Sequence, residues 1–123
     1  MTYVLIAIGG ACGAVARFAL DAWVSPRIAG DIPWGTLLIN VSGSFLLGLL
    51  FALTVERGVL PADLRPPLMV GFLGAYTTFS SWMLESLRLV EDGAWLAAIV
   101  NVAGSVALGM AAVVIGIAVG RNV

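Results

Sequence analysis

Hydrophobic residues gather into four long runs that are separated by short polar segments. The runs cover residues 3–23, 33–56, 66–91 and 94–120. Each run is long enough for a helix to cross the bilayer core, which takes about 20 apolar residues. Pro33 and Pro66 suit a first helical turn, and the pair Asp92-Gly93 predicts a tight turn before the last run. We therefore predict an all-α integral membrane protein, a single membrane domain with four transmembrane helices.

The third run differs from the others because its middle is rich in small and hydroxyl-bearing residues. Residues Gly71 to Trp82 include two glycines and four serine or threonine side chains. Hydroxyl groups compete for main-chain hydrogen bonds and glycine adds backbone freedom, so we expect the third helix to be broken here. Free backbone at membrane depth must be buried in protein or line a wet cavity, and in transporters such half-helix ends bind ions. The alternative is that small residues only let helices pack closely.

Composition supports a membrane location and excludes several classes of function. Hydrophobic residues make up 61% of the 123 residues and charged residues 11%, which is too apolar for one small soluble globule. The net charge of −1 argues against nucleic-acid binding. An enzyme is the least favoured class, because the chain has no histidine, no plausible metal-ligand cluster and no nucleophile paired with a base. Its single cysteine, Cys12, excludes a disulfide framework.

The arginines are divided almost evenly between the two ends of the predicted helices. One end carries Arg57, Arg65 and Arg121, the other Arg27 and Arg88, and Arg17 lies inside the first run. An excess of positive charge in short loops normally sets the orientation of a membrane protein. We therefore hypothesise that the chain inserts both ways and pairs with its own inverted copy as an antiparallel, dual-topology homodimer. The alternative is that one marginal charge decides the orientation.

Polar residues recur every four positions along the second and fourth runs. The positions are Thr36, Asn40, Ser44 and Gly48 in the second run and Asn101, Ser105 and Gly109 in the fourth. This spacing puts each set on one side of its helix. Such stripes either line a pore or hold helices together, since interhelical hydrogen bonds are also common in membranes. For Asn40 we favour the pore, because packing alone rarely satisfies a full amide.

The chemistry of these stripes suits a small polar solute or an ion, and the sign of the ion stays open. Hydroxyls and amides donate hydrogen bonds to an anion, whereas carbonyls freed by a helix break coordinate a cation. Phe79 and Trp82 lie three residues apart and could offer the positive edges of their rings to an anion. Two charged positions also fall within the runs. Arg17 is one turn before Asp21, which predicts an ion pair, and we expect Glu85 to be a structural partner or helix-end group.

Three ordered blocks of sequence resemble the CrcB or Fluc family of fluoride channels. The blocks are Gly9–Phe18, Gly35–Phe45 and Gly71–Trp82. The resemblance covers essentially the whole chain and implies an antiparallel, dual-topology homodimer in the inner (plasma) membrane. It also implies two fluoride pores that passively export toxic fluoride from the cytoplasm, and a structural sodium ion at the dimer centre.

The resemblance assigns roles to individual residues. The main-chain carbonyls of Gly74 and Thr77 would hold the sodium ion. The pore residues would be Asn40, Phe79, Ser80, Ser81, Asn101 and Ser105. Two positions depart from the family pattern. Phe18 stands where a tyrosine is frequent, and Trp82 stands where a second pore phenylalanine is expected, although its indole could still present a ring edge and has a true N–H donor.

Two other interpretations remain. A proton-coupled drug exporter of the small four-helix kind can also form an inverted dimer, but it needs a carboxylate deep in the first helix, where this chain has Arg17 and no acid before Asp21. A purely structural subunit would leave the polar stripes and the helix break without a purpose.

Overall fold

A computed structural model describes residues 1–123, which form helices and no strands. The three long helices are α1 (Thr2–Val24), α2 (Trp34–Phe51) and α5 (Trp95–Asn122). The chain between α2 and α5 forms the π-helical turn η1 (Ala52–Glu56), the 3-10 turn η2 (Ala62–Leu64), the π-helix η3 (Pro66–Leu73), and the helices α3 (Gly74–Tyr76) and α4 (Phe79–Glu91). The predicted all-helical class is confirmed.

Three helical segments are long and apolar enough to cross a membrane. They are Thr2–Val24, Trp34–Glu56 and Trp95–Asn122. The third hydrophobic run does not form one helix of that length, because the backbone is extended at Thr77 and Thr78. The predicted break of the third helix is therefore present. It divides this run into η3 with α3 on one side and α4 on the other.

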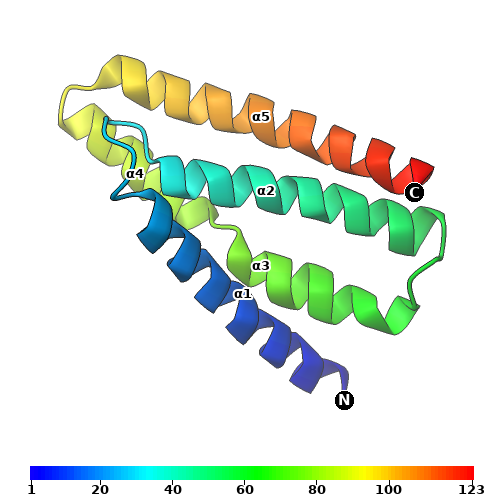
Figure 1. The fold of residues 1–123 in the computed structure, drawn as a ribbon. Helices are drawn as coiled ribbons and strands as arrows, with labels where there is room; N and C mark the ends of the chain where they lie inside the picture. The colour runs from blue at the N-terminus through cyan, green and yellow to red at the C-terminus, as the bar shows by residue number, and fades with distance from the viewer.

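The four hydrophobic runs alternate in direction along the molecule (Figure 1). Helices α2 and α5 run side by side, while α1 crosses η3 and α3 on the other side of the molecule (Figure 1). Both termini and the connection between η1 and η3 lie at one end, and the connections that follow α1 and α4 lie at the other (Figure 1). The structure thus separates the arginine-bearing loops as the sequence pattern predicts.

Glycines allow α2 and α5 to approach until their backbones touch. A Cβ atom added to Gly48 would overlap the carbonyl oxygen of Val113, and one added to Gly116 would overlap that of Phe45. Helices in lipid gain little from the hydrophobic effect between them, so close van der Waals contact through small residues supplies much of their attraction. Gly48 therefore belongs to the α2–α5 contact, as the packing interpretation of the polar stripe predicts.

A second glycine contact joins α1 to η3. A Cβ atom on Gly13 would overlap the carbonyl oxygen of Phe72, and one on Gly71 would lie 2.6 Å from the oxygen of Ile6. Gly71 is helical, and so is Gly74, whose φ is −64°. The expectation that glycine flexibility helps to break the helix is thus wrong, since the glycines precede the break and Gly71 serves packing.

Two adjacent threonines make the break. Thr77 has ψ of 155°, and Thr78 has φ of −144° and ψ of 113°, both extended conformations that β-branched residues favour. The Thr77 hydroxyl donates back to the carbonyl of Leu73 at 2.9 Å, which satisfies the last turn before the break. The Thr78 hydroxyl accepts from the Ser81 N–H at 3.3 Å and so caps the start of α4.

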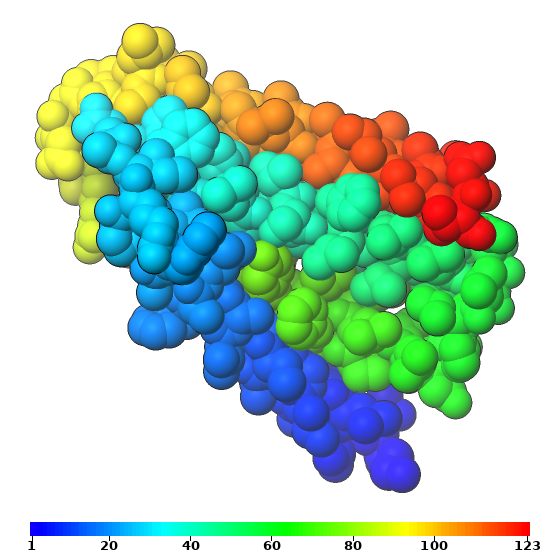
Figure 2. All heavy atoms as spheres, in the orientation of Figure 1, coloured from blue at the N-terminus to red at the C-terminus, as the bar shows by residue number.

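The buried core of the single chain is small and lies next to the break. It is formed by Ile39, Leu73 and Tyr76. Only 20 of the 123 residues are buried, while many large apolar side chains, such as Phe18 and Phe79, are exposed. Figure 2 shows one face of the chain, from which the first residues of α1 protrude. An apolar surface of this extent needs lipid or another protein surface to cover it.

Candidate functional site

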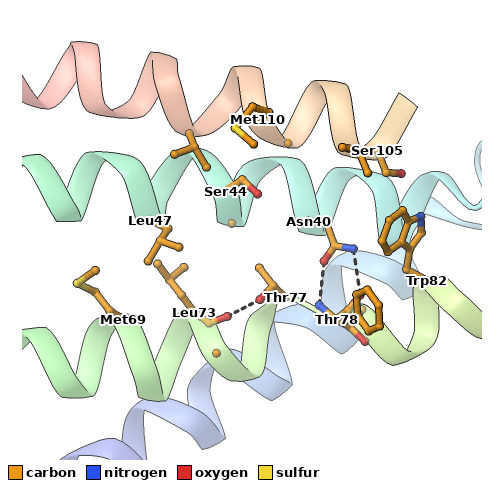
Figure 3. Close-up of a pocket in the computed structure, with 16 residues that line it drawn as sticks. Asn40, Ser44, Leu47, Met69, Leu73, Thr77, Thr78, Trp82, Ser105 and Met110 are labelled. Carbon is orange, nitrogen blue, oxygen red and sulfur yellow. Dashed lines mark hydrogen bonds between the residues drawn. The ribbon is translucent and has the colours of Figure 1, made fainter. Parts of the chain in front are cut away.

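A cavity of about 460 Å³ opens beside the break in the third run. Residues from α2, η3, α3, α4, α5 and the break line it (Figure 3). Six of the nine residues predicted for the pore or the sodium site contribute to its wall: Asn40, Gly74, Thr77, Phe79, Trp82 and Ser105. These six residues contribute one amide, two hydroxyls, two aromatic rings and one glycine to the wall of the cavity.

Asn40 is bound to the main chain of the break rather than free in the cavity. Its Nδ2 donates to the carbonyl of Thr78 at 3.0 Å, and the Thr78 N–H donates to its Oδ1 at 2.8 Å. Figure 3 shows the amide pointing from α2 to the break with both bonds. The amide pairs with Thr78 as a neighbouring β-strand would, and one N–H of the amide remains for another partner.

The break leaves two carbonyl oxygens without hydrogen bonds. The N–H that would complete a helical bond to Gly74 belongs to Thr78 and is donated to Asn40. The N–H that would bond to Thr77 belongs to Ser81 and is donated to the hydroxyl of Thr78. None of the hydrogen bonds of the turns, loops and helix caps reaches either carbonyl oxygen. Free carbonyl oxygens are suitable ligands for an alkali cation, so this pair fits a sodium ion chemically.

Two aromatic rings stand at the start of α4. The rings of Phe79 and Trp82 meet edge to face, with centroids 5.7 Å apart and planes at 72°. Phe79 is 71% exposed in the single chain. The indole N–H of Trp82 donates to the main-chain oxygen of Asn101 at 3.4 Å, so this donor is directed at α5 and not into the cavity.

Three of the predicted pore residues do not line this cavity. Ser80 is exposed, and Ser81 holds the cap of α4 with its N–H and with its hydroxyl, which accepts from Thr78 at 3.0 Å. Asn101 is 2% exposed and donates to the hydroxyl of Ser86 at 2.9 Å. Of the two predicted pore residues in the fourth run, only Ser105 reaches the cavity, and its buried hydroxyl has no partner within the chain.

The charged residues of the spans are arranged differently from the prediction. Arg17 makes no ion pair or hydrogen bond, and the carboxylate of Asp21 accepts from the Ser25 hydroxyl at 2.7 Å. The predicted Arg17–Asp21 pair is therefore wrong. Helical side chains lean towards the N-terminus, which carries Arg17 away from an acid located one turn later.

Glu85 does act as a structural partner, through a hydrogen bond with a threonine. Its Oε1 accepts from the Thr36 hydroxyl at 2.8 Å, a bond that ties α4 to the start of α2. Its second oxygen, Oε2, is buried and has no partner in the chain.

Sequence reasoning missed the part played by Thr78. This residue receives both bonds of Asn40, caps α4 and lines the cavity. A threonine three residues before a serine, at the start of an amphipathic segment, is a recognisable N-cap pattern and was the available signal. Ser44, for which the sequence left pore lining and packing both open, also lines the cavity, as do Met69 and Met110.

Comparison with known proteins identifies the family of the chain. Residues 4–117 match the family described as "CrcB-like protein, Camphor Resistance (CrcB)". The chain belongs to the CrcB family. It is a multi-pass membrane protein, as its apolar helices indicate.

Several CrcB relatives carry the name "Fluoride-specific ion channel FluC". The Magnetococcus marinus protein is 47% identical over 116 residues, covering 94% of each chain. FluC 1 of Symbiobacterium thermophilum is 47% identical over 121 residues, covering 98% of each chain. The Methylococcus capsulatus protein is 51% identical over 121 residues, which cover 95% of this chain and 51% of that one.

Replacing Asn40 by alanine should destabilise the break. Two hydrogen bonds are lost and the N–H and C=O of Thr78 are left unpaired in an apolar setting, which costs about 2–4 kcal/mol in the free energy of unfolding. Denaturant unfolding in detergent micelles measures this loss, and hydrogen exchange at the Thr78 N–H should become faster. Ser44→Ala is the matched control, because Ser44 lines the same cavity from the same helix and makes no hydrogen bond. Equal stability of both variants would contradict the role given to Asn40.

Proposed function

We propose that this chain is a fluoride channel that lets fluoride leave the cytoplasm passively across the plasma membrane, and that it is not an enzyme. The observation that carries this proposal is its 47% identity, over 94% of both chains, to a protein named as a fluoride-specific ion channel. The cavity beside the broken helix supports it, because hydrogen-bond donors and aromatic rings converge there.

The cavity offers weak ligands of the right kind for a small anion. The free N–H of Asn40 and the unpartnered hydroxyl of Ser105 are donors, and the exposed ring of Phe79 has a positive edge. No cationic side chain lines the cavity. Conduction requires binding strong enough to admit an ion and weak enough to release it, which neutral donors satisfy better than an arginine or lysine.

Fluoride efflux from liposomes tests the function. The purified protein should release fluoride and retain chloride. Asn40→Ala and Phe79→Ile should each slow fluoride efflux by roughly ten-fold, equivalent to about 1.4 kcal/mol in the barrier, because each removes a cavity ligand. Phe51→Ile, at the far end of α2 and outside the cavity, is the matched control and should conduct normally. Wild-type liposomes that retain fluoride would refute the function itself.

We further propose that the working unit is an antiparallel homodimer with two pores and one structural sodium ion. The free carbonyls of Gly74 and Thr77 support the sodium site. One chain supplies only two such ligands, and a two-fold axis through the break presents each of them twice. Gly74 is exposed in the single chain and a Cβ atom there would touch only the Met69 oxygen at 3.9 Å, so the break is accessible to a second copy.

Replacing sodium with N-methylglucamine on both sides of the membrane should slow fluoride efflux and weaken the dimer. This bulky cation cannot enter a ring of carbonyls, so four oxygens would then face one another without a charge between them. Efflux rate and dimer fraction, the latter by single-molecule photobleaching in dilute liposomes, are measured together. Potassium replacement separates a size-selective site from a general salt effect. Unchanged efflux and dimer fraction would contradict the sodium site.

The even distribution of arginines supports dual topology, and surface labelling tests it. A cysteine added after Val123 in a Cys12→Ala background should react with a membrane-impermeant maleimide from both sides, in comparable amounts, in intact cells and inverted vesicles. Adding two lysines beside Arg121 should shift labelling to the cytoplasmic side. Labelling from one side alone in the unmodified chain would exclude dual topology.

A further inference from the structure

We propose that Trp82 is a positioning residue, which locks α4 against α5 and thereby holds the Phe79 ring at the cavity. This inference rests on the proposed function, in which Phe79 is an anion ligand. Its support is independent of that function, since it comes from a closed set of hydrogen bonds between α4 and α5.

Three hydrogen bonds form a closed ring, in which two bonds join α4 to α5 and the third lies within α4. The Trp82 indole donates to the main-chain oxygen of Asn101 at 3.4 Å. The Asn101 amide donates to the Ser86 hydroxyl at 2.9 Å, and that hydroxyl donates to the main-chain oxygen of Trp82 at 2.7 Å. Each residue therefore makes two of the bonds, and the ring joins the first turns of α4 to the first turns of α5.

Two of the three residues in this hydrogen-bonded ring are buried. Asn101 is 2% exposed and Ser86 8%. Few other contacts hold these helices together, because α4 is short and packs less extensively on α5 than α2 does. Hydrogen bonds in a water-poor site constrain geometry more strongly than the same bonds at a surface. The hydrogen-bonded ring therefore restricts the rotation of α4 about its own axis, together with the Thr36–Glu85 bond on the α2 side.

The rotation of α4 decides where the Phe79 ring lies. Phe79 is the first residue of α4 and follows the extended Thr78, so no preceding helical turn supports its side chain. The indole supplies that support through the edge-to-face contact, with ring centroids 5.7 Å apart. Trp82 thus connects the hydrogen-bonded ring to the aromatic group in the cavity.

The same geometry distinguishes positioning from direct anion binding by the indole. The N–H of Trp82 is already donated to Asn101, so it is not an available donor for a passing anion. Trp82 contributes a rigid ring, and its single donor serves the contact between helices.

The test combines substitutions that break the ring of hydrogen bonds with a spectroscopic probe on the Phe79 side chain. Trp82→Phe keeps an aromatic ring but removes the N–H. Ser86→Ala removes the linking hydroxyl without touching the cavity wall, and Ser86→Thr restores that hydroxyl. A 4-fluorophenylalanine placed at position 79 reports the ring environment by ¹⁹F NMR in detergent. Trp95→Phe changes an exposed indole that makes no hydrogen bond and is the matched control.

We expect Trp82→Phe and Ser86→Ala to shift or broaden the ¹⁹F signal and to slow fluoride efflux by about two- to five-fold. The expected effect is small for the loss of a hydrogen bond, because the 3.4 Å between the Trp82 Nε1 and the main-chain oxygen of Asn101 is a long separation. The double variant Trp82→Phe/Ser86→Ala should slow fluoride efflux no more than the stronger single variant does, because both substitutions break the same ring of hydrogen bonds. Ser86→Thr and Trp95→Phe should match the wild type in both measurements.

Two results would overturn the proposal. In the first, both variants leave the signal unchanged, so the ring of bonds does not hold Phe79. In the second, Trp82→Phe changes the signal while Ser86→Ala does not, so the indole acts through its own contact alone. The ¹⁹F measurement does not depend on transport. A wild-type protein that conducts no fluoride would therefore refute the proposed function and leave the positioning role decided by the ¹⁹F signal.

Discussion

The pairing of the Asn40 amide with the main chain of Thr78 is the interaction on which the rest of this structure depends. A helix cannot be interrupted inside a bilayer unless other groups satisfy the backbone that it exposes. Asn40 supplies one donor and one acceptor to a residue that has left the helix, and the two bonds are 3.0 and 2.8 Å long. A side-chain amide can replace a neighbouring peptide in this way because it carries both an N–H donor and a C=O acceptor. The main chain of Thr78 at the break is therefore hydrogen-bonded to a side chain instead of being left unpaired.

Satisfying Thr78 leaves other groups free. The N–H of Thr78 is donated to Asn40 and is therefore not available to the Gly74 carbonyl. The N–H of Ser81 is donated to the capping hydroxyl of Thr78 and is not available to the Thr77 carbonyl. The same contacts that stabilise the break therefore leave two carbonyl oxygens without their helical hydrogen bonds. The proposed cation site and the proposed anion cavity therefore share a common origin in the break.

The surrounding helices keep this arrangement rigid by two different means. On one side, glycines bring the backbones of α2 and α5, and of α1 and η3, into direct contact. On the other side α4 has fewer such contacts and relies on polar links, namely Thr36 with Glu85 and the ring of bonds through Asn101. Some of the hydroxyl and amide residues that the sequence pattern assigns to a pore therefore form these links between helices.

The four runs, their ends and the break in the third could all be predicted from the sequence. These features depend on local properties: the length of apolar stretches, proline and glycine at turns, and the tendency of hydroxyl residues to leave a helix. The gathering of Asn40, Phe79, Trp82 and Ser105 around one cavity also followed from spacing and family resemblance. Tertiary structure alone decided that Asn40 holds Thr78, that Asn101 faces Ser86, and that Arg17 stays unpaired. Periodicity tells which residues share a side of one helix, but a hydrogen bond depends on which helix lies opposite and at what height, and that is set only when the helices pack.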